Sequence, residues 1–110
     1  MDKSYVKACR LGDVKENQAT LTRVNGSEVL LIKMDGEVYA CDSYCTHEST
    51  PLGEGEVING EIQCMRHGAR FDIKTGRATQ MPAVIDIKTY AVKIVNDDVF
   101  IALQQDRRNQ

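Results

Sequence analysis

The residues with metal-binding chemistry are concentrated in two short segments of this chain. Cys45-Thr46-His47 places a thiol and an imidazole two residues apart, and Cys64-Met65-Arg66-His67 places them three residues apart. These segments use both histidines of the protein and two of its four cysteines. Thiolate and imidazole groups are ligands that suit zinc and iron–sulfur clusters. The spacing therefore predicts that the two segments converge on one metal centre.

Two kinds of centre fit two cysteines and two histidines. A structural zinc ion takes four such ligands in a tetrahedral site. Zinc fingers, however, pair cysteine with cysteine and histidine with histidine, and a helix follows. Here each segment supplies one cysteine and one histidine, and no helical pattern follows. The alternating order favours a centre of two irons, in which each segment gives a thiolate to one iron and an imidazole to the other.

The rest of the chain must position these ligands, and its pattern is that of β-strands. Short runs rich in Val, Ile, Thr and Tyr alternate with turn signals. The expected strands are 5–10, 20–24, 28–34, 37–40, 57–58, 61–62, 70–73, 90–95 and 99–103. Asn-Gly and Asp-Gly dipeptides between them favour tight hairpins, because these residues tolerate positive φ. No long helical period occurs, and residues 13–18 are expected to form a short helical turn or a loop. The pattern predicts an all-β antiparallel sandwich or barrel.

Two stretches interrupt the strand pattern, and they hold the ligands. Residues 42–55 contain few apolar side chains and carry the first pair, while residues 64–69 carry the second pair. A hairpin at Asn59-Gly60 would return the second stretch to the side of the first. We therefore expect one domain over residues 1–110, with a small ligand-binding subdomain made of these two loops.

Length and composition exclude several functions. A chain of 110 residues is the size of one domain. The net charge of -2 lacks the basic excess typical of nucleic-acid binding. No apolar run approaches the roughly 18 residues of a membrane helix, and the first residues show no secretory signal pattern. We expect a monomeric cytoplasmic protein that binds neither nucleic acid nor membrane, with Cys9 and Cys41 as small buried core residues.

Taken together, the two ligand segments resemble the Rieske [2Fe–2S] signature. The similarity consists of Cys-x-His, a gap of sixteen residues and Cys-x-x-His-Gly, and it extends through Phe71-Asp72 to the closing hairpin. It implies a Rieske-type β-sandwich or barrel that holds one [2Fe–2S] cluster. The resemblance places Cys45 and Cys64 on the buried iron and His47 and His67 on the outer iron. Two thiolates instead of four make the oxidised centre neutral, which raises its reduction potential.

Departures from one branch of the family imply a low potential within it. Quinol-oxidising members carry a disulfide between the loops, but Thr50 and Arg66 occupy the matching positions here. Those members also place a serine and a tyrosine where this chain has Ala69 and Phe71. Fewer hydrogen bonds to sulfur stabilise the reduced cluster less. We therefore expect a potential toward the low end of the roughly -150 to +300 mV Rieske range.

Several residues near the ligands admit two interpretations. Residues 80–83, which include Met81-Pro82-Ala83, resemble the family's third loop that shields the cluster, but they would also suit an ordinary bend with proline kept off the ladder. Gly53, Gly55 and Gly68 would let backbone N–H groups approach the sulfides, or they would simply turn the loops. Met65-Arg66 would contact a partner or form a solvated loop tip.

The resemblance implies a carrier of electrons and not an enzyme. All four protein positions around the irons are filled, so no open metal site remains for a substrate. The expected donor is a flavin-dependent NAD(P)H reductase, and the expected acceptor is a terminal oxygenase that hydroxylates aromatic rings. One alternative is a small Rieske-like subunit of a nitrite reductase or a similar enzyme. The other is a structural zinc module without a redox role.

Overall fold

The computed structural model describes residues 5–44, 52, 55–64, 68–81 and 85–103, and these are almost entirely β-structure. The strands are β1 (Tyr5–Arg10), β2 (Ala19–Val24), β3 (Ser27–Met34), β4 (Glu37–Asp42), β5 (Glu56–Ile58), β6 (Glu61–Gln63), β7 (Arg70–Asp72), β8 (Ala78–Gln80), β9 (Thr89–Tyr90), β10 (Val92–Val95) and β11 (Asp98–Ala102). The all-β prediction is confirmed.

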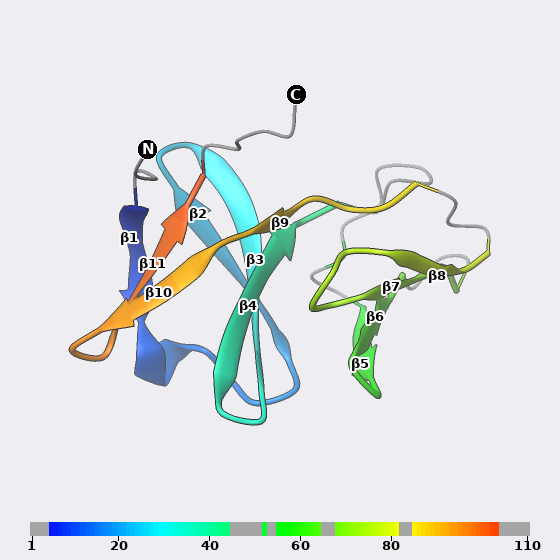
Figure 1. Cartoon of the computed structure of the whole chain (residues 1–110), viewed down its shortest axis with the longest axis horizontal. Helices are drawn as coiled ribbons and strands as arrows, with labels where there is room; N and C mark the ends of the chain where they lie inside the picture. Colours follow the sequence, from blue (N-terminus) through cyan, green and yellow to red (C-terminus); the bar gives the residue numbers. More distant parts are fainter. Residues whose placement is uncertain (1–4, 45–51, 53–54, 65–67, 82–84, 104–110) are drawn as a thin grey trace.

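The strands form three antiparallel sheets. Their orders are β1-β11-β10, β2-β3-β4-β9 and β5-β6-β7-β8. The first two sheets lie together on the left of Figure 1, and we call them the base. The third sheet, which we call the distal sheet, lies on the right of the same view. Six of the eight neighbouring pairs in these sheets are consecutive in sequence, as hairpins joined by tight turns require.

Strand β3 is buried on both faces and divides the core into two parts. Its residues Val29, Leu30, Leu31 and Ile32 are all 0% exposed. Because successive side chains of a strand point to opposite faces, Val29 and Leu31 pack between the two base sheets, while Leu30 and Ile32 pack toward the distal sheet. A continuous apolar run is what burial on both faces of a strand demands.

The chain leaves the base at the end of β4 and returns to it just before β9. At this point the Asp42 N–H donates to the Lys88 carbonyl (3.0 Å), and the Tyr90 hydroxyl donates to Asp42 Oδ1 (2.6 Å). Burial and the neighbouring Asp42 carboxylate raise the pKa of Tyr90, so the phenol stays neutral and keeps donating. Everything between these residues, including both ligand stretches, is one continuous excursion from the base.

Most expected strands match the structure, but residues 90–95 do not form one strand. Tyr90 pairs with Ala40 of β4, whereas Val92 pairs with Ile101 of β11. The chain passes from one base sheet to the other between them, as strands do at sandwich corners. The expected single strand over residues 90–95 is therefore wrong, and Ile94 of β10 is 42% exposed.

Two further segments differ from expectation. Helical geometry occurs at Leu11–Asp13, as a short 3-10 turn, and residues 14–18 form a loop in which Glu16 bridges to Lys33. Strand β8 was not expected, because Ala78–Gln80 has no apolar alternation. It becomes a strand through its pairing with the preceding strand β7, which the side-chain pattern of Ala78–Gln80 alone does not indicate.

Gly76 fixes the turn between β7 and β8 against the segment that returns to the base. Its φ is +80°, its N–H donates to the Asp72 carbonyl (2.7 Å), and its own carbonyl accepts from the Ile87 N–H (2.8 Å). A Cβ at this position would lie 2.2 Å from the Ile87 carbonyl oxygen. Only glycine permits both this φ and this close approach.

Replacing Gly76 should therefore destabilise the fold more than replacing a glycine of similar φ in open space. Gly36, with a φ of +83° and no atom within 4 Å of its Cβ position, is the matched control. We expect Gly36→Ala to cost about 1 kcal/mol from left-handed strain, and Gly76→Ala to cost a further amount of about 1–3 kcal/mol from the clash. Urea unfolding measures both, and equal losses in the two variants would contradict this account of Gly76.

Candidate metal centre

Of the four expected ligands, Cys64 lies among the described residues, and Cys45, His47 and His67 lie outside them. Cys64 directly follows β6 and is 1% exposed. It belongs to the apolar cluster between the base and the distal sheet, together with Leu52 of the first ligand stretch. The structure thus places one predicted ligand in the apolar core, at the first residue of its loop.

Two backbone hydrogen bonds close the second ligand stretch at its base. The Cys64 N–H donates to the Ala69 carbonyl (2.7 Å), and the Gly68 N–H donates to the Cys64 carbonyl (3.1 Å). Gly68 has a φ of +77°, which glycine adopts without strain. The stretch is the connection between β6 and β7, whose pairing ends at Gln63 and Arg70. The two described ends of the loop that carries the second Cys/His pair are therefore joined by hydrogen bonds where the pairing of β6 and β7 ends.

The described parts of the first ligand stretch lie against the second. The Leu52 N–H donates to the Ser43 carbonyl (2.7 Å), and the Gly55 N–H donates to the Leu52 carbonyl (2.9 Å). A Cβ on Gly55 would lie 2.1 Å from the carbonyl oxygen of Gln63, the residue before Cys64. The end of the first stretch thus lies against the residue that precedes the second, while the convergence of the four ligands stays a prediction.

These contacts also decide between the two interpretations of two glycines. The N–H groups of both Gly55 and Gly68 are donated to backbone carbonyls within their own loops. The structure therefore supports loop turning and close approach as their role. Gly53 lies outside the described residues, as do Thr50 and Met65-Arg66.

The outward face of the distal sheet carries a polar row that sequence reasoning missed. Arg70 Nε donates to Gln63 Oε1 (3.0 Å), and the Arg70 guanidinium lies 3.7 Å from Glu61 Oε1. Gln80 Nε2 donates to the Gly68 carbonyl (3.0 Å), so the row ends on the second ligand loop. On β6 and β7 its members alternate with the buried residues Ile62 and Phe71, which was the available sequence signal, whereas β8 shows no such alternation.

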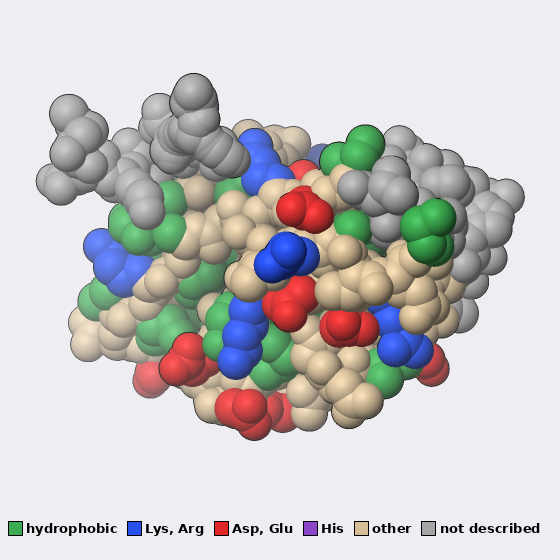
Figure 2. Space-filling view, turned by 45° about the vertical axis from the view of Figure 1, so that its right-hand side comes forward, with side chains coloured by type: hydrophobic (Ala, Val, Ile, Leu, Met, Phe, Trp, Pro, Cys, Tyr) green, Lys and Arg blue, Asp and Glu red, His purple; other side chains and the backbone are tan. Residues whose placement is uncertain are grey.

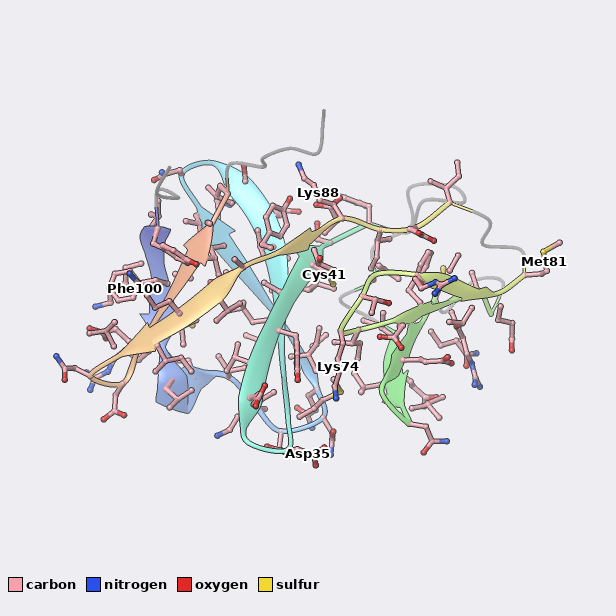
Figure 3. All side chains as sticks on the ribbon, viewed as in Figure 1. Asp35, Cys41, Lys74, Met81, Lys88 and Phe100 are labelled. Carbon is pink, nitrogen blue, oxygen red and sulfur yellow. The ribbon has the colours of Figure 1, made fainter. Side chains whose placement is uncertain are left out.

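Cys41 and Cys9 behave as core residues. Cys41 is 0% exposed and lies on β4, on the side of the base that faces the distal sheet (Figure 3). Burial, with a smaller contribution from Asp42, raises the pKa of Cys41 to about 12, so it remains a thiol. Cys9 is partly buried against the core of the base, and burial raises its pKa as well. The prediction that Cys41 is a buried core residue is confirmed. Cys9 is only partly buried, so the same prediction holds for it in part.

The expected third loop begins where β8 ends. Met81 is 71% exposed and points away from the outer end of the distal sheet (Figure 3). Residues 82–84 lie outside the described residues, so shielding by this loop stays a prediction.

Ala69 and Phe71 are both 0% exposed beside Cys64, and neither brings a hydroxyl into this buried region. Among the described residues, no helix is long and apolar enough to cross a membrane.

Comparison with known proteins decides which kind of centre these loops hold. The family model described as "Rieske [2Fe-2S] domain" matches residues 4–91. This chain belongs to the Rieske [2Fe–2S] family. The structural zinc alternative is thereby set aside, and the expected Rieske-type fold is confirmed.

Proteins similar to this Rieske chain are small ferredoxins. The ferredoxin component of a naphthalene 1,2-dioxygenase system from Pseudomonas putida is 40% identical over 94% of this chain and 99% of its own length. The ferredoxin component of naphthalene 1,2-dioxygenase/salicylate 5-hydroxylase systems from Ralstonia sp. is 38% identical over 94% of this chain and 100% of its own. The solved structure of a Sphingomonas yanoikuyae B1 ferredoxin has a TM-score of 0.86 and 32% identity, and the match covers 92% of this chain and 100% of that one.

The residues present fit the family's [2Fe–2S] cluster. Two cysteines and two histidines are the donor set of a Rieske centre, and this chain supplies both pairs at the family's spacing. Cys64 is 1% exposed in apolar surroundings. A thiolate buried there is costly unless a metal ion neutralises its charge, which is what ligation of iron provides.

Replacing the two buried cysteines separately should distinguish a ligand from a core residue. We expect Cys41→Ala to keep full iron content and the visible spectrum, because its protonated thiol packs without ligating. Cys64→Ala should lose the cluster entirely. Iron and sulfide analysis of both purified variants tests this, and loss of the cluster in Cys41→Ala with correct folding would refute the assignment of Cys41 to the core.

Proposed function

We propose that this chain is a one-electron carrier that takes electrons from a flavin-dependent NAD(P)H reductase and delivers them to a terminal oxygenase. The observation that carries the proposal is the end-to-end similarity to proteins that are themselves ferredoxin components of dioxygenase systems, at 38–40% identity over 94% of this chain. Those relatives are carriers and not catalysts, so this chain supplies electrons to chemistry that occurs elsewhere.

Cys45 and Cys64 would hold the inner iron, and His47 and His67 would hold the outer iron. A bound cluster of this kind supplies one-electron redox chemistry. Cys64 lies in the apolar cluster together with Leu52. This cluster excludes water from the side of the centre that would hold the inner iron. The histidine side would then be the edge at which electrons enter and leave, because the family resemblance assigns the histidines to the outer iron.

The surface suits brief encounters with more than one partner. On the face shown in Figure 2, acidic and basic side chains are interspersed, and no extensive patch of one sign covers it. Weak electron-transfer encounters use small interfaces, which a chain of this size can supply. The reductase as donor, the cytoplasmic location and the monomeric state are part of this proposal. A small subunit of a nitrite reductase is the competing assignment, and stable co-purification with a large subunit would favour it.

Spectra of the reduced protein and of its histidine variants test the ligand set. We expect a coloured protein with a Rieske-type electron resonance signal after reduction. His47→Ala and His67→Ala should each abolish that signal, because each removes a ligand of the outer iron. A signal that survives either change would disprove the assignment of that histidine.

The carrier role is tested by reconstitution with a reductase and an aromatic-ring oxygenase, in which oxygenase turnover should depend on this chain.

The reduction potential should rise when a hydroxyl is added beside Cys64. Ala69→Ser introduces a donor at a 0% exposed position, whereas Ala78→Ser is a control on the edge of the same apolar cluster. One hydrogen bond to a charged acceptor is worth about 1.5 kcal/mol, which is about 60 mV for one electron. Protein-film voltammetry measures both variants. An unchanged potential in fully loaded Ala69→Ser would show that position 69 does not face the cluster.

A further inference from the structure

Strand β8 makes a side-chain contact with the second ligand loop that no backbone pairing accounts for. Gln80 Nε2 donates to the Gly68 carbonyl at 3.0 Å. Gly68 directly follows the expected ligand His67 and precedes the buried Ala69. The contact therefore acts on the peptide bond that joins Gly68 to Ala69, just after the proposed ligand His67.

A bulge in β8 gives Gln80 this position. Arg70 pairs with Gln80 and Phe71 pairs with Ala78, so Thr79 is the extra residue between them. Bulges of this kind re-aim a side chain near functional sites. Without the extra residue, the position opposite Arg70 would be occupied by Thr79, whose side chain is too short to span the distance that the Gln80 amide spans.

The neighbouring polar row holds the surroundings of Gly68 in place. Arg70 Nε donates to Gln63 Oε1 at 3.0 Å, which fixes the orientation of the Gln63 amide. The Nε2 atom of this amide then points away from Arg70. The position of a Cβ on Gly68 would lie 3.8 Å from Gln63 Nε2 and 3.9 Å from Gln80 Nε2. Two amide nitrogens from two strands thus flank Gly68 on the outward face of the distal sheet.

The orientation of this peptide matters for a cluster held by the loop. In a trans peptide the carbonyl and the N–H point in opposite directions. Because Gln80 holds the Gly68 carbonyl toward the outward face, the N–H of Ala69 is turned to the opposite side, where Ala69 is 0% exposed. A backbone N–H directed at a cluster stabilises its reduced state and raises its potential.

We propose that Gln80 is a positioning residue, which holds the Gly68–Ala69 peptide in this orientation and thereby raises the reduction potential of the centre. This inference rests on the proposed ligand set. Gln80 touches no reacting atom and acts through the Gly68 carbonyl. Since β8 continues directly into the exposed Met81, the same residue links the second ligand loop to the start of the third.

The test replaces Gln80 by Met, which is similar in length and uncharged but has no hydrogen-bond donor. Thr79→Val, on the neighbouring exposed bulge residue, is the matched control. We expect Gln80→Met to keep its full iron content and to lower the equilibrium constant for reduction by about three- to tenfold, where tenfold equals 59 mV for one electron. The electron resonance signal of the reduced state should shift as well. Thr79→Val should match the parent protein in both measurements.

A second variant separates hydrogen bonding from packing. Gln80→Lys restores a donor at the same place, and it should raise the potential above that of Gln80→Met by more than the charge-matched control Thr79→Lys raises that of the parent protein. Parent-like potential and resonance spectrum in iron-loaded Gln80→Met would overturn the inference, as would a Gln80→Lys variant no better than Gln80→Met. If the parent protein itself lacks a Rieske signal, the ligand set fails instead. The two failures are therefore distinguishable.

Discussion

The burial of β3 on both of its faces is the constraint on which the rest of the molecule depends. Four consecutive residues, Val29 to Ile32, are removed from water. Alternate side chains then serve two different cores, one inside the base and one against the distal sheet. A shift of one residue in the register of β3 would exchange these two sets and mismatch both cores. The metal centre is therefore positioned by the same strand that makes the base stable.

The ligand loops extend from the second of these cores. Leu52 and Cys64 bring one residue from each ligand stretch into it, and the Gly55 backbone contacts Gln63 so closely that a side chain at position 55 is excluded. Short loops on paired strands lose less conformational entropy when they bind a cofactor than long free loops do.

The sequence predicted well what depends on local pattern. Alternating apolar residues located most strands, Asn-Gly and Asp-Gly located hairpins, and ligand types at a particular spacing identified the family. It failed where the choice of the partner strand decides the outcome. The chain turns between Tyr90 and Val92 because these two residues pair with strands of two different sheets. Strand β8 forms because it pairs with the edge of β7. The amide of Gln80 could not be linked to Gly68 without knowing the bulge that aims it.

The hydrogen bond from Asp42 to Lys88 has a consequence for how this fold diversifies. It joins the two ends of the excursion that contains every proposed ligand, so this whole segment enters and leaves the base at one point. A segment with adjacent ends can be lengthened, shortened or exchanged with little strain on the scaffold that receives it. Grafting residues 43–87 between related base domains would then transfer the redox properties as a unit, while the base keeps its own stability and its own surface.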